Sequence, residues 1–175
     1  MKALYFDCFS GISGDMTLGA LLDLGIDKDA FLAEMAKLNV EGFEIKIGRT
    51  EKSGIGAQDV DVILTNGEFI DEHHHHHDHD HHEHHHAHEH RGMHEVMDIL
   101  AAADLSEGAR KLAVKIFTIL GEAEAKAHGT TLENVHFHEV GAVDSIVDIV
   151  GASVCLDNLG IQDVVIRELA EGHGM

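Results

Sequence analysis

A histidine-rich tract in the middle of the chain sets the first limit on the fold. Thirteen of the eighteen residues from His73 to His90 are histidine, and four of the other five carry a carboxylate. A segment this polar has no apolar side chains with which to build a core. We therefore predict a disordered loop over residues 68–91 and a fold built from the segments on either side of it.

The same tract indicates metal traffic. Imidazole-rich chains bind nickel, copper and zinc, and the order of their affinities depends on the metal rather than on the geometry of the site. The tract is thus expected to gather metal as a reservoir, without the fixed geometry of a catalytic site. Its first ligands are five consecutive histidines: His73, His74, His75, His76 and His77.

Length and charge narrow the class of protein. The 175 residues are enough for one ordinary domain with a sizeable core. A net charge of −20 argues against binding to nucleic acid or to anionic membranes, and no apolar run approaches the roughly 20 residues of a membrane helix. The only two cysteines, Cys8 and Cys155, provide no disulfide framework, so we expect reduced thiols in a cytoplasmic protein.

Hydrophobic periodicity predicts the order β-αα-ββ-loop-αα-α-β. This order is typical of an α/β fold of the mixed α+β kind, with a small mixed sheet packed with about five helices. The first strand is expected to be buried, and two glycines between the second and third strands indicate a hairpin with a bulged or long turn. The expected strands are residues 2–7, 43–47, 60–64 and 163–167, and the expected helices are residues 16–24, 28–38, 94–103, 106–128 and 144–159.

The stretch HFHEVGAVDSIVDIVG, residues 136–151, concentrates the candidate site residues. His136 and His138 flank one residue, so their imidazoles share a side if the segment is extended, and Glu139 follows. Asp144 and Asp148 are four residues apart and share one face of the predicted helix. Imidazoles and carboxylates that converge where a loop meets a helix suit a divalent metal or a general base.

Structural roles for these residues remain open. Asp144 is also a favoured residue for a helix N-cap, and His136 and His138 can be ordinary surface or core histidines. Asp148 interrupts the apolar run IVDIV, where a buried carboxylate is unfavourable unless it is paired or bound to metal. The alternative is that its face of the helix is simply solvated.

A second candidate site follows the first strand. The turn SGISGDM comes between that strand and a helix, an arrangement that binds anions through backbone N–H groups and the helix dipole. The alternative is a tight connection that needs the freedom of glycine. Lys52 near the hairpin turn can reach an anionic ligand or be an ordinary solvated charge. The anion-binding candidates in the turn are Ser10, Gly11, Ser13, Gly14 and Asp15.

Several motifs together resemble the LarC family. They are DCFSGISGDM at the start, KSGIGA in the hairpin, the internal histidine-rich loop, AEAKAHGTTLENVHFHEVGAVDSIVDIVGA, and the closing GHGM. The resemblance implies a CTP-dependent cyclometallase, a lyase that inserts Ni²⁺ into pyridinium-3,5-bisthiocarboxylic acid mononucleotide. Two sulfur–nickel bonds and one carbon–nickel bond then form the nickel-pincer cofactor, whose recipient is lactate racemase.

The resemblance also implies how the protein is divided. Residues 1–175 correspond to the N-terminal nickel-insertion portion, and a C-terminal domain, absent from this chain, binds CTP with Mn²⁺ or Mg²⁺. This chain alone is then not expected to be catalytically competent. We expect the full-length form to be a homo-oligomer.

The implied chemistry assigns roles to the candidates. Ring metallation releases a proton, for which Glu139, His136 or His138 would be the base. The substrate phosphate would lie on the turn from Ser10 to Asp15, with Lys52 nearby. The expected metal ligands outside the histidine tract are Asp7, His136, His138, Asp144 and Asp148.

Two other classes of protein stay open. The first is a non-enzymatic nickel store or metallochaperone, in which the histidine tract is the whole function. The second is an aspartyl phosphotransferase with Asp7 as nucleophile at the end of the first strand. Such enzymes place a second acid two residues further on, where this chain has Phe9.

Overall fold

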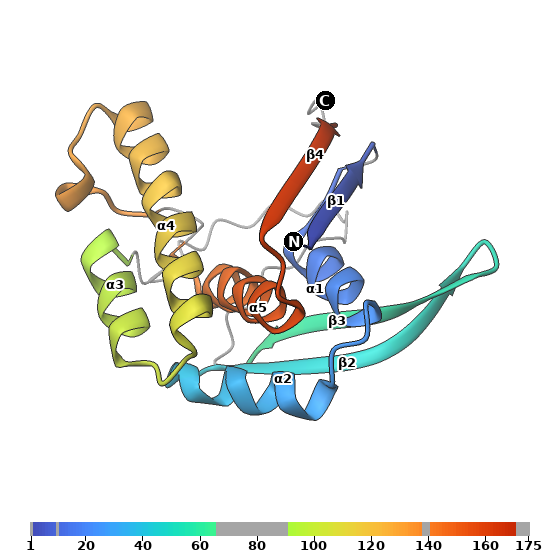
Figure 1. The fold of residues 1–175 in the computed structure, drawn as a ribbon. Helices are drawn as coiled ribbons and strands as arrows, with labels where there is room; N and C mark the ends of the chain where they lie inside the picture. Colours follow the sequence, from blue (N-terminus) through green and yellow to red (C-terminus); the bar gives the residue numbers. More distant parts are fainter. Residues whose placement is uncertain (1, 10, 66–90, 138–140, 171–175) are drawn as a thin grey trace, which may run out of the picture.

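The computed structural model describes residues 2–9, 11–65, 91–137 and 141–170, and its order of elements confirms the predicted α/β class (Figure 1). Within these ranges two short 3-10 helices accompany the main elements, at Ala36–Leu38 and Leu132–Asn134. The strands are β1 (Ala3–Cys8), β2 (Phe43–Lys52), β3 (Ile55–Leu64) and β4 (Asp163–Leu169). The helices are α1 (Gly14–Asp23), α2 (Lys28–Met35), α3 (Met93–Ala102), α4 (Glu107–His128) and α5 (Val143–Leu159).

Most of the helix starts follow from capping residues that the sequence displays. The side chains of Ser13, Asp27 and Ser106 accept hydrogen bonds from backbone N–H groups in the first turns of α1, α2 and α4. Helix α5 begins differently, because its N-cap is Ala142 and provides no side-chain bond. The interpretation of Asp144 as an N-cap is therefore wrong: it lies inside the first turn, where its Oδ1 accepts from the N–H of Ser145 at 2.8 Å.

Helix α5 lies at the centre of the molecule (Figure 1). It contacts α1, α2, α4 and β3, and its buried side chains join one continuous core. Phe117 and Phe137 meet edge to face in this core, with ring centroids 6.2 Å apart. Because α5 carries both Asp144 and Asp148, its central position brings these carboxylates close to the other elements.

Strands β2 and β3 form a long antiparallel hairpin that runs from the Phe43–Leu64 pair to the Lys52–Ile55 pair. Its turn consists of two residues, Ser53 and Gly54, with φ of 54° and 78°. Positive φ at both turn positions is typical of a type I′ turn, which matches the twist of the strands. The expectation of a bulged or long turn is therefore wrong, and both strands continue further than predicted.

Strands β1 and β4 form a separate parallel pair, from Ala3–Asp163 to Phe6–Ile166, with an irregularity before the Cys8–Leu169 pair. Parallel and antiparallel pairing thus occur in two small sheets rather than side by side in one. The expectation of a buried first strand is wrong, since β1 alternates between exposed and partly buried residues and Tyr5 is 53% exposed. Figure 1 shows this pair extending away from the helices.

The predicted loop, residues 68–91, lies outside the described residues except for Arg91, whose guanidinium donates to the carbonyl of Gly141 at 3.1 Å. None of the helices in the described ranges is long and apolar enough to cross a membrane.

Candidate functional site

Helix α1 lies unusually close to both of its neighbours because glycines stand at the points of contact. A methyl group on Gly19 would come within 2.7 Å of the carbonyl oxygen of Gln58 in β3. On the α5 side, a methyl group on Gly14 would overlap the Asp148 carboxylate, and one on Gly151 would lie 2.9 Å from a Leu18 methyl. Glycine is thus required on both sides of α1, and its first turn is held between α5 and β3.

This packing brings together five aspartates, which we call the carboxylate cluster: Asp15 from α1, Asp59 and Asp61 from β3, and Asp144 and Asp148 from α5. Partial burial, together with the negative charges of Asp15 and Asp144, raises the pKa of Asp148 from 3.8 to about 7. Much of Asp15 is exposed, yet partial burial of its carboxylate and the charge of Asp61 raise its pKa as well. Asp15 and Asp148 therefore both resist ionisation.

Asp148 is the least satisfied member of the cluster. Its Oδ1 is buried and has no hydrogen-bond partner among the described residues, and the charges that shift its pKa are all negative. We expected a buried Asp148 to be either paired with a protein group or bound to metal. No pairing with a protein group is seen in the described part of the chain. A bound cation would relieve both the desolvation and the repulsion.

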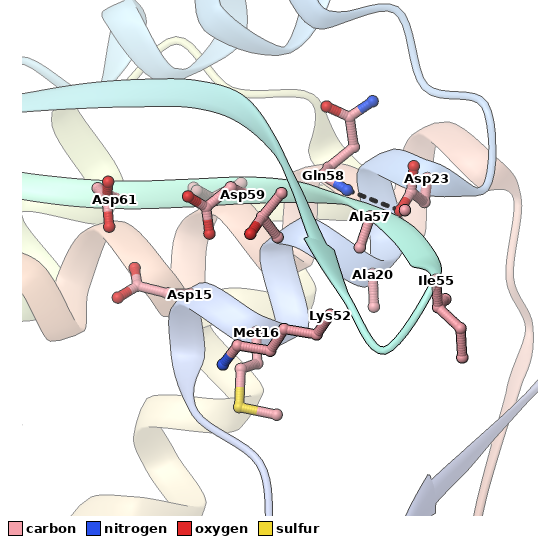
Figure 2. Close-up of a pocket in the computed structure, with 13 residues that line it drawn as sticks. Asp15, Met16, Ala20, Asp23, Lys52, Ile55, Ala57, Gln58, Asp59 and Asp61 are labelled. Carbon is pink, nitrogen blue, oxygen red and sulfur yellow. Dashed lines mark hydrogen bonds between the residues drawn. The ribbon is translucent and has the colours of Figure 1, made fainter.

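A cleft of about 630 Å³ opens beside the cluster, between α1 and the β2–β3 hairpin (Figure 2). Four of the described residues that line it are aspartates and one, Lys52, is a cation. The backbone N–H of Gln58 donates to Asp23 Oδ2 at 2.8 Å, which fastens the hairpin to the end of α1. The cleft is lined by Asp15, Met16, Ala20, Asp23, Thr50, Lys52, Ile55, Gly56, Ala57, Gln58, Asp59, Val60 and Asp61.

Carboxylate oxygens in this arrangement suit a divalent cation, but the described side chains alone do not form a complete coordination site. No set of three or more His, Cys, Asp or Glu side chains in the described ranges is placed to hold a metal ion together. The carboxylates therefore shape an attractive potential next to the cleft rather than a closed metal site.

The structure brings together some of the predicted site residues. Asp144 and Asp148 meet Asp15 in the carboxylate cluster, Gly14 lies against Asp148, and Lys52 shares the cleft with Asp15.

Other predicted residues have different surroundings. The Ser13 hydroxyl caps α1 by accepting from the Met16 N–H at 3.2 Å, and the Gly11 N–H donates to the Cys8 carbonyl at 3.1 Å in a turn where Gly11 has φ +83°. Asp7 is exposed within β1, which pairs with β4.

The corner at His136 is only partly described. His136 is exposed and forms an isolated antiparallel bridge with Gly92, just before α3. Its neighbours Val135 and Phe137 are both buried, so burial alternates over these three positions. Eight of the predicted site residues lie outside the described residues: Ser10, His73, His74, His75, His76, His77, His138 and Glu139.

Asp59 and Asp61 were not among the predicted site residues. The signal was present in the alternation Asp59-Val60-Asp61-Val62, which puts both carboxylates on one side of a strand. Only the packing of α1 against β3 shows that these carboxylates lie near Asp15.

Comparison with known proteins finds a family model and several relatives that match nearly the whole chain. Residues 4–175 match the family model described as "Nickel insertion protein". The chain is 51% identical over 171 residues to the pyridinium-3,5-bisthiocarboxylic acid mononucleotide nickel insertion protein of Alkaliphilus metalliredigens, a match covering 98% of this chain and 40% of the relative. Identity to the protein of the same name from Geobacillus kaustophilus is 45%, over 99% of this chain and 40% of the relative.

A third relative of that name, from Acetivibrio thermocellus, is 43% identical over 99% of this chain. The chain thus spans about 40% of the length of the curated relatives it matches. No solved structure matches it.

Proposed function

The chain belongs to the nickel insertion protein family, and on that premise we propose that it collects Ni²⁺ and delivers it for insertion into pyridinium-3,5-bisthiocarboxylic acid mononucleotide. The product would be the nickel-pincer cofactor that lactate racemase receives. The observation that carries the proposal is the carboxylate cluster beside the cleft, in which the Asp148 Oδ1 is buried without a partner among the described residues. We propose a cytoplasmic location for this chemistry.

An incomplete set of ligands favours transfer over storage. Nickel is the cargo here, and the described residues bring together fewer than three side chains to hold it, which would leave coordination positions open. The two sulfur atoms of the substrate can occupy those positions before the ion leaves the carboxylates. A closed site of four or more protein ligands would hold the ion more firmly and hinder its release.

Electrostatics suggests an order of binding. The substrate is a mononucleotide with an anionic phosphate, and the cleft is lined by four aspartates, so the empty cleft repels it. Nickel bound first would offset two of the negative charges. Lys52, whose side chain extends toward Met16 in Figure 2, would then contact the phosphate.

The histidine tract is connected to the cluster through β3. Thr65 follows β3, and its backbone N–H donates to the Gly42 carbonyl at 2.8 Å. Asp61 lies four residues before Thr65, which is roughly 13 Å along a strand. Attachment to the same chain alone gives the tract a high effective concentration near the cluster. Nickel gathered by the tract would thus reach the cluster without leaving the protein.

The rest of the reaction is assigned by family resemblance. Glu139, His136 and His138 remain the proposed bases for the ring proton. CTP, with Mn²⁺ or Mg²⁺, would bind the part of the relatives that this chain does not match, and the full-length protein would be a homo-oligomeric CTP-dependent cyclometallase. The remaining alternative, a nickel store, is favoured by the tract itself.

Nickel transfer by two variants tests the proposal. The 175-residue chain is combined with the unmatched part of the Alkaliphilus metalliredigens relative, Ni²⁺, CTP and the substrate, and the nickel-containing cofactor is measured by mass spectrometry. Asp148→Ala should slow its formation at least about tenfold, equivalent to about 1.4 kcal/mol, whereas Asp104→Ala, an exposed control at the end of α3, should not.

Omitting the relative's unmatched part should abolish the product. Equal rates for the two variants would remove the cluster from the transfer step. A chain that binds nickel but never releases it to the substrate would favour the nickel store.

A further inference from the structure

The β1–β4 pair carries apolar side chains on both of its faces. On one face Leu4 and Phe6 of β1 lie beside Val164 and Ile166 of β4, and on the other Tyr5 lies beside Val165. Paired residues share a face because side chains alternate along each strand. Continuous apolar runs of this kind are typical of parallel strands that are covered on both sides.

Neither face is fully covered. β4 is exposed along its whole length, with Val164 48%, Val165 50% and Ile166 55% exposed. In β1 Leu4 reaches the core, while Tyr5 is 53% exposed. Elsewhere in the described structure large apolar side chains on a helix or strand are mostly buried, so much of the exposure is concentrated in this pair.

The edges of the pair are open as well. Among the described residues β1 pairs only with β4, and the two strands contact mainly each other. Figure 1 shows them side by side and directed away from the helices. An all-parallel pair with two open edges and two apolar faces has the properties of the interior of a larger sheet.

We infer that this pair, residues 3–8 and 163–169, is a docking surface for the polypeptide that makes up the rest of the family's length. That polypeptide would add at least one strand to an open edge and an apolar layer to a face. The relatives supply enough chain for this, because the matched segment is only 40% of their length. A second copy of this chain is disfavoured as the occupant, since each copy carries a net charge of −20.

The inference is tested by co-expressing the 175-residue chain with a tagged polypeptide that comprises the unmatched part of the Alkaliphilus metalliredigens relative. The two should co-purify at a fixed ratio. Val165→Lys should reduce the recovered chain by about tenfold, because it puts a charge in the apolar face. Ile119→Lys is the matched control: Ile119 is 57% exposed, but it lies on α4, and its substitution should change recovery by less than about twofold.

Hydrogen exchange of the unsubstituted proteins gives a second measurement that does not depend on any variant. Backbone amides of β4 should exchange at least about tenfold more slowly in the complex than in the free chain, whereas those of α4 should not change. Failure to co-purify, equal loss for the two variants, or unchanged exchange in β4 would each overturn the inference. So would light scattering that shows a dimer of the free chain which Val165→Lys dissociates, since the occupant would then be a second copy.

Discussion

The junction of α1, α5 and β3 and the β1–β4 pair are incomplete in opposite ways. At the junction the backbone approaches are so close that Gly14, Gly19 and Gly151 cannot bear a side chain without displacement, yet Asp15 and Asp148 are repelled there by neighbouring carboxylates. In the β1–β4 pair the register is regular over four residue pairs, yet apolar side chains stay exposed. The junction is well packed but poorly neutralised, whereas the pair is well ordered but poorly covered.

This difference indicates what each region needs. A packed site with unsatisfied negative charge is completed by a cation, which adds charge and hardly any volume. An ordered strand pair with exposed apolar area is completed by another polypeptide, which adds area and backbone partners. Nickel and the rest of the family's chain are thus expected to act at separate places, and substitutions should separate their effects.

A large loss of stability is expected from Gly14→Ala. The new methyl group would overlap the carboxylate and the Cβ of Asp148, so the free energy of unfolding should fall by about 2 kcal/mol, measured by urea denaturation. Gly48→Ala is the control, because no atom lies within 4 Å of the position of its methyl group. The same Gly14→Ala change in an Asp148→Ala background should be less harmful, and an equal loss in both backgrounds would show that the close contact with Asp148 is not responsible.

A smaller effect of opposite sign is expected from Asp148→Asn in buffer containing a chelator. In the folded chain the pKa of Asp148 is about 7, against about 3.9 when unfolded. Between these values the folded state holds a proton that the unfolded state releases, so stability falls as pH rises from about 4 to about 7. Because the carboxylate is partly solvated, we expect the variant to melt only about 2–4 °C higher at pH 8.

Melting temperatures measured over a series of pH values include an internal control. Wild-type protein and Asp104→Asn should lose stability over the same window, while Asp148→Asn should lose less. Adding Ni²⁺ at pH 8 should raise the melting temperature of the wild type more than that of Asp148→Asn. A variant that melts lower than the wild type at pH 8 would mean that the carboxylate has a stabilising partner.

In the strand pair, by contrast, Val165→Thr should hardly change the stability of the free chain. Val165 is half exposed, so the free energy of unfolding should change by no more than about 0.5 kcal/mol. Leu18→Ala, at a fully buried position of α1, should lower it by about 2–5 kcal/mol in the same denaturation experiment. A loss at Val165 as large as that at Leu18 would show that β4 is already covered in solution.

The smallest effect on stability is expected from deletion of residues 73–90. The tract has one alanine and otherwise only histidine, aspartate and glutamate, so its removal takes no apolar contact from the core. The melting temperature without metal should change by no more than about 2 °C, while a nickel titration should lose most of its weak sites. A larger fall in melting temperature would mean that the tract supports the fold.

Local signals in the sequence were sufficient for most of the elements. Ser106 marks the start of α4 because its hydroxyl caps the helix. The spacing of four residues from Leu112 to Leu120 runs beside the buried stripe of α4, which includes Ala113, Phe117 and Gly121. The hairpin turn was misjudged because Ser53 adopts a positive φ, which is uncommon for a residue other than glycine. The burial of β1 was misjudged because an apolar strand does not reveal whether anything covers it.

The candidate site likewise combines features that the sequence predicts with features that only tertiary contacts produce. That Asp144 and Asp148 share a helix face follows from their spacing of four residues, and the sequence by itself determined it. It also determined the tract of histidines, the net charge and the family, because these depend on the composition and order of residues and on no tertiary contact. Tertiary structure alone decided that Asp15, Asp59 and Asp61 join those two carboxylates, since α1 and β3 reach α5 only through contacts between residues far apart in the chain. The raised pKa of Asp148 is a tertiary property for the same reason: it arises from burial and from the charges of neighbours, one of which is on another helix.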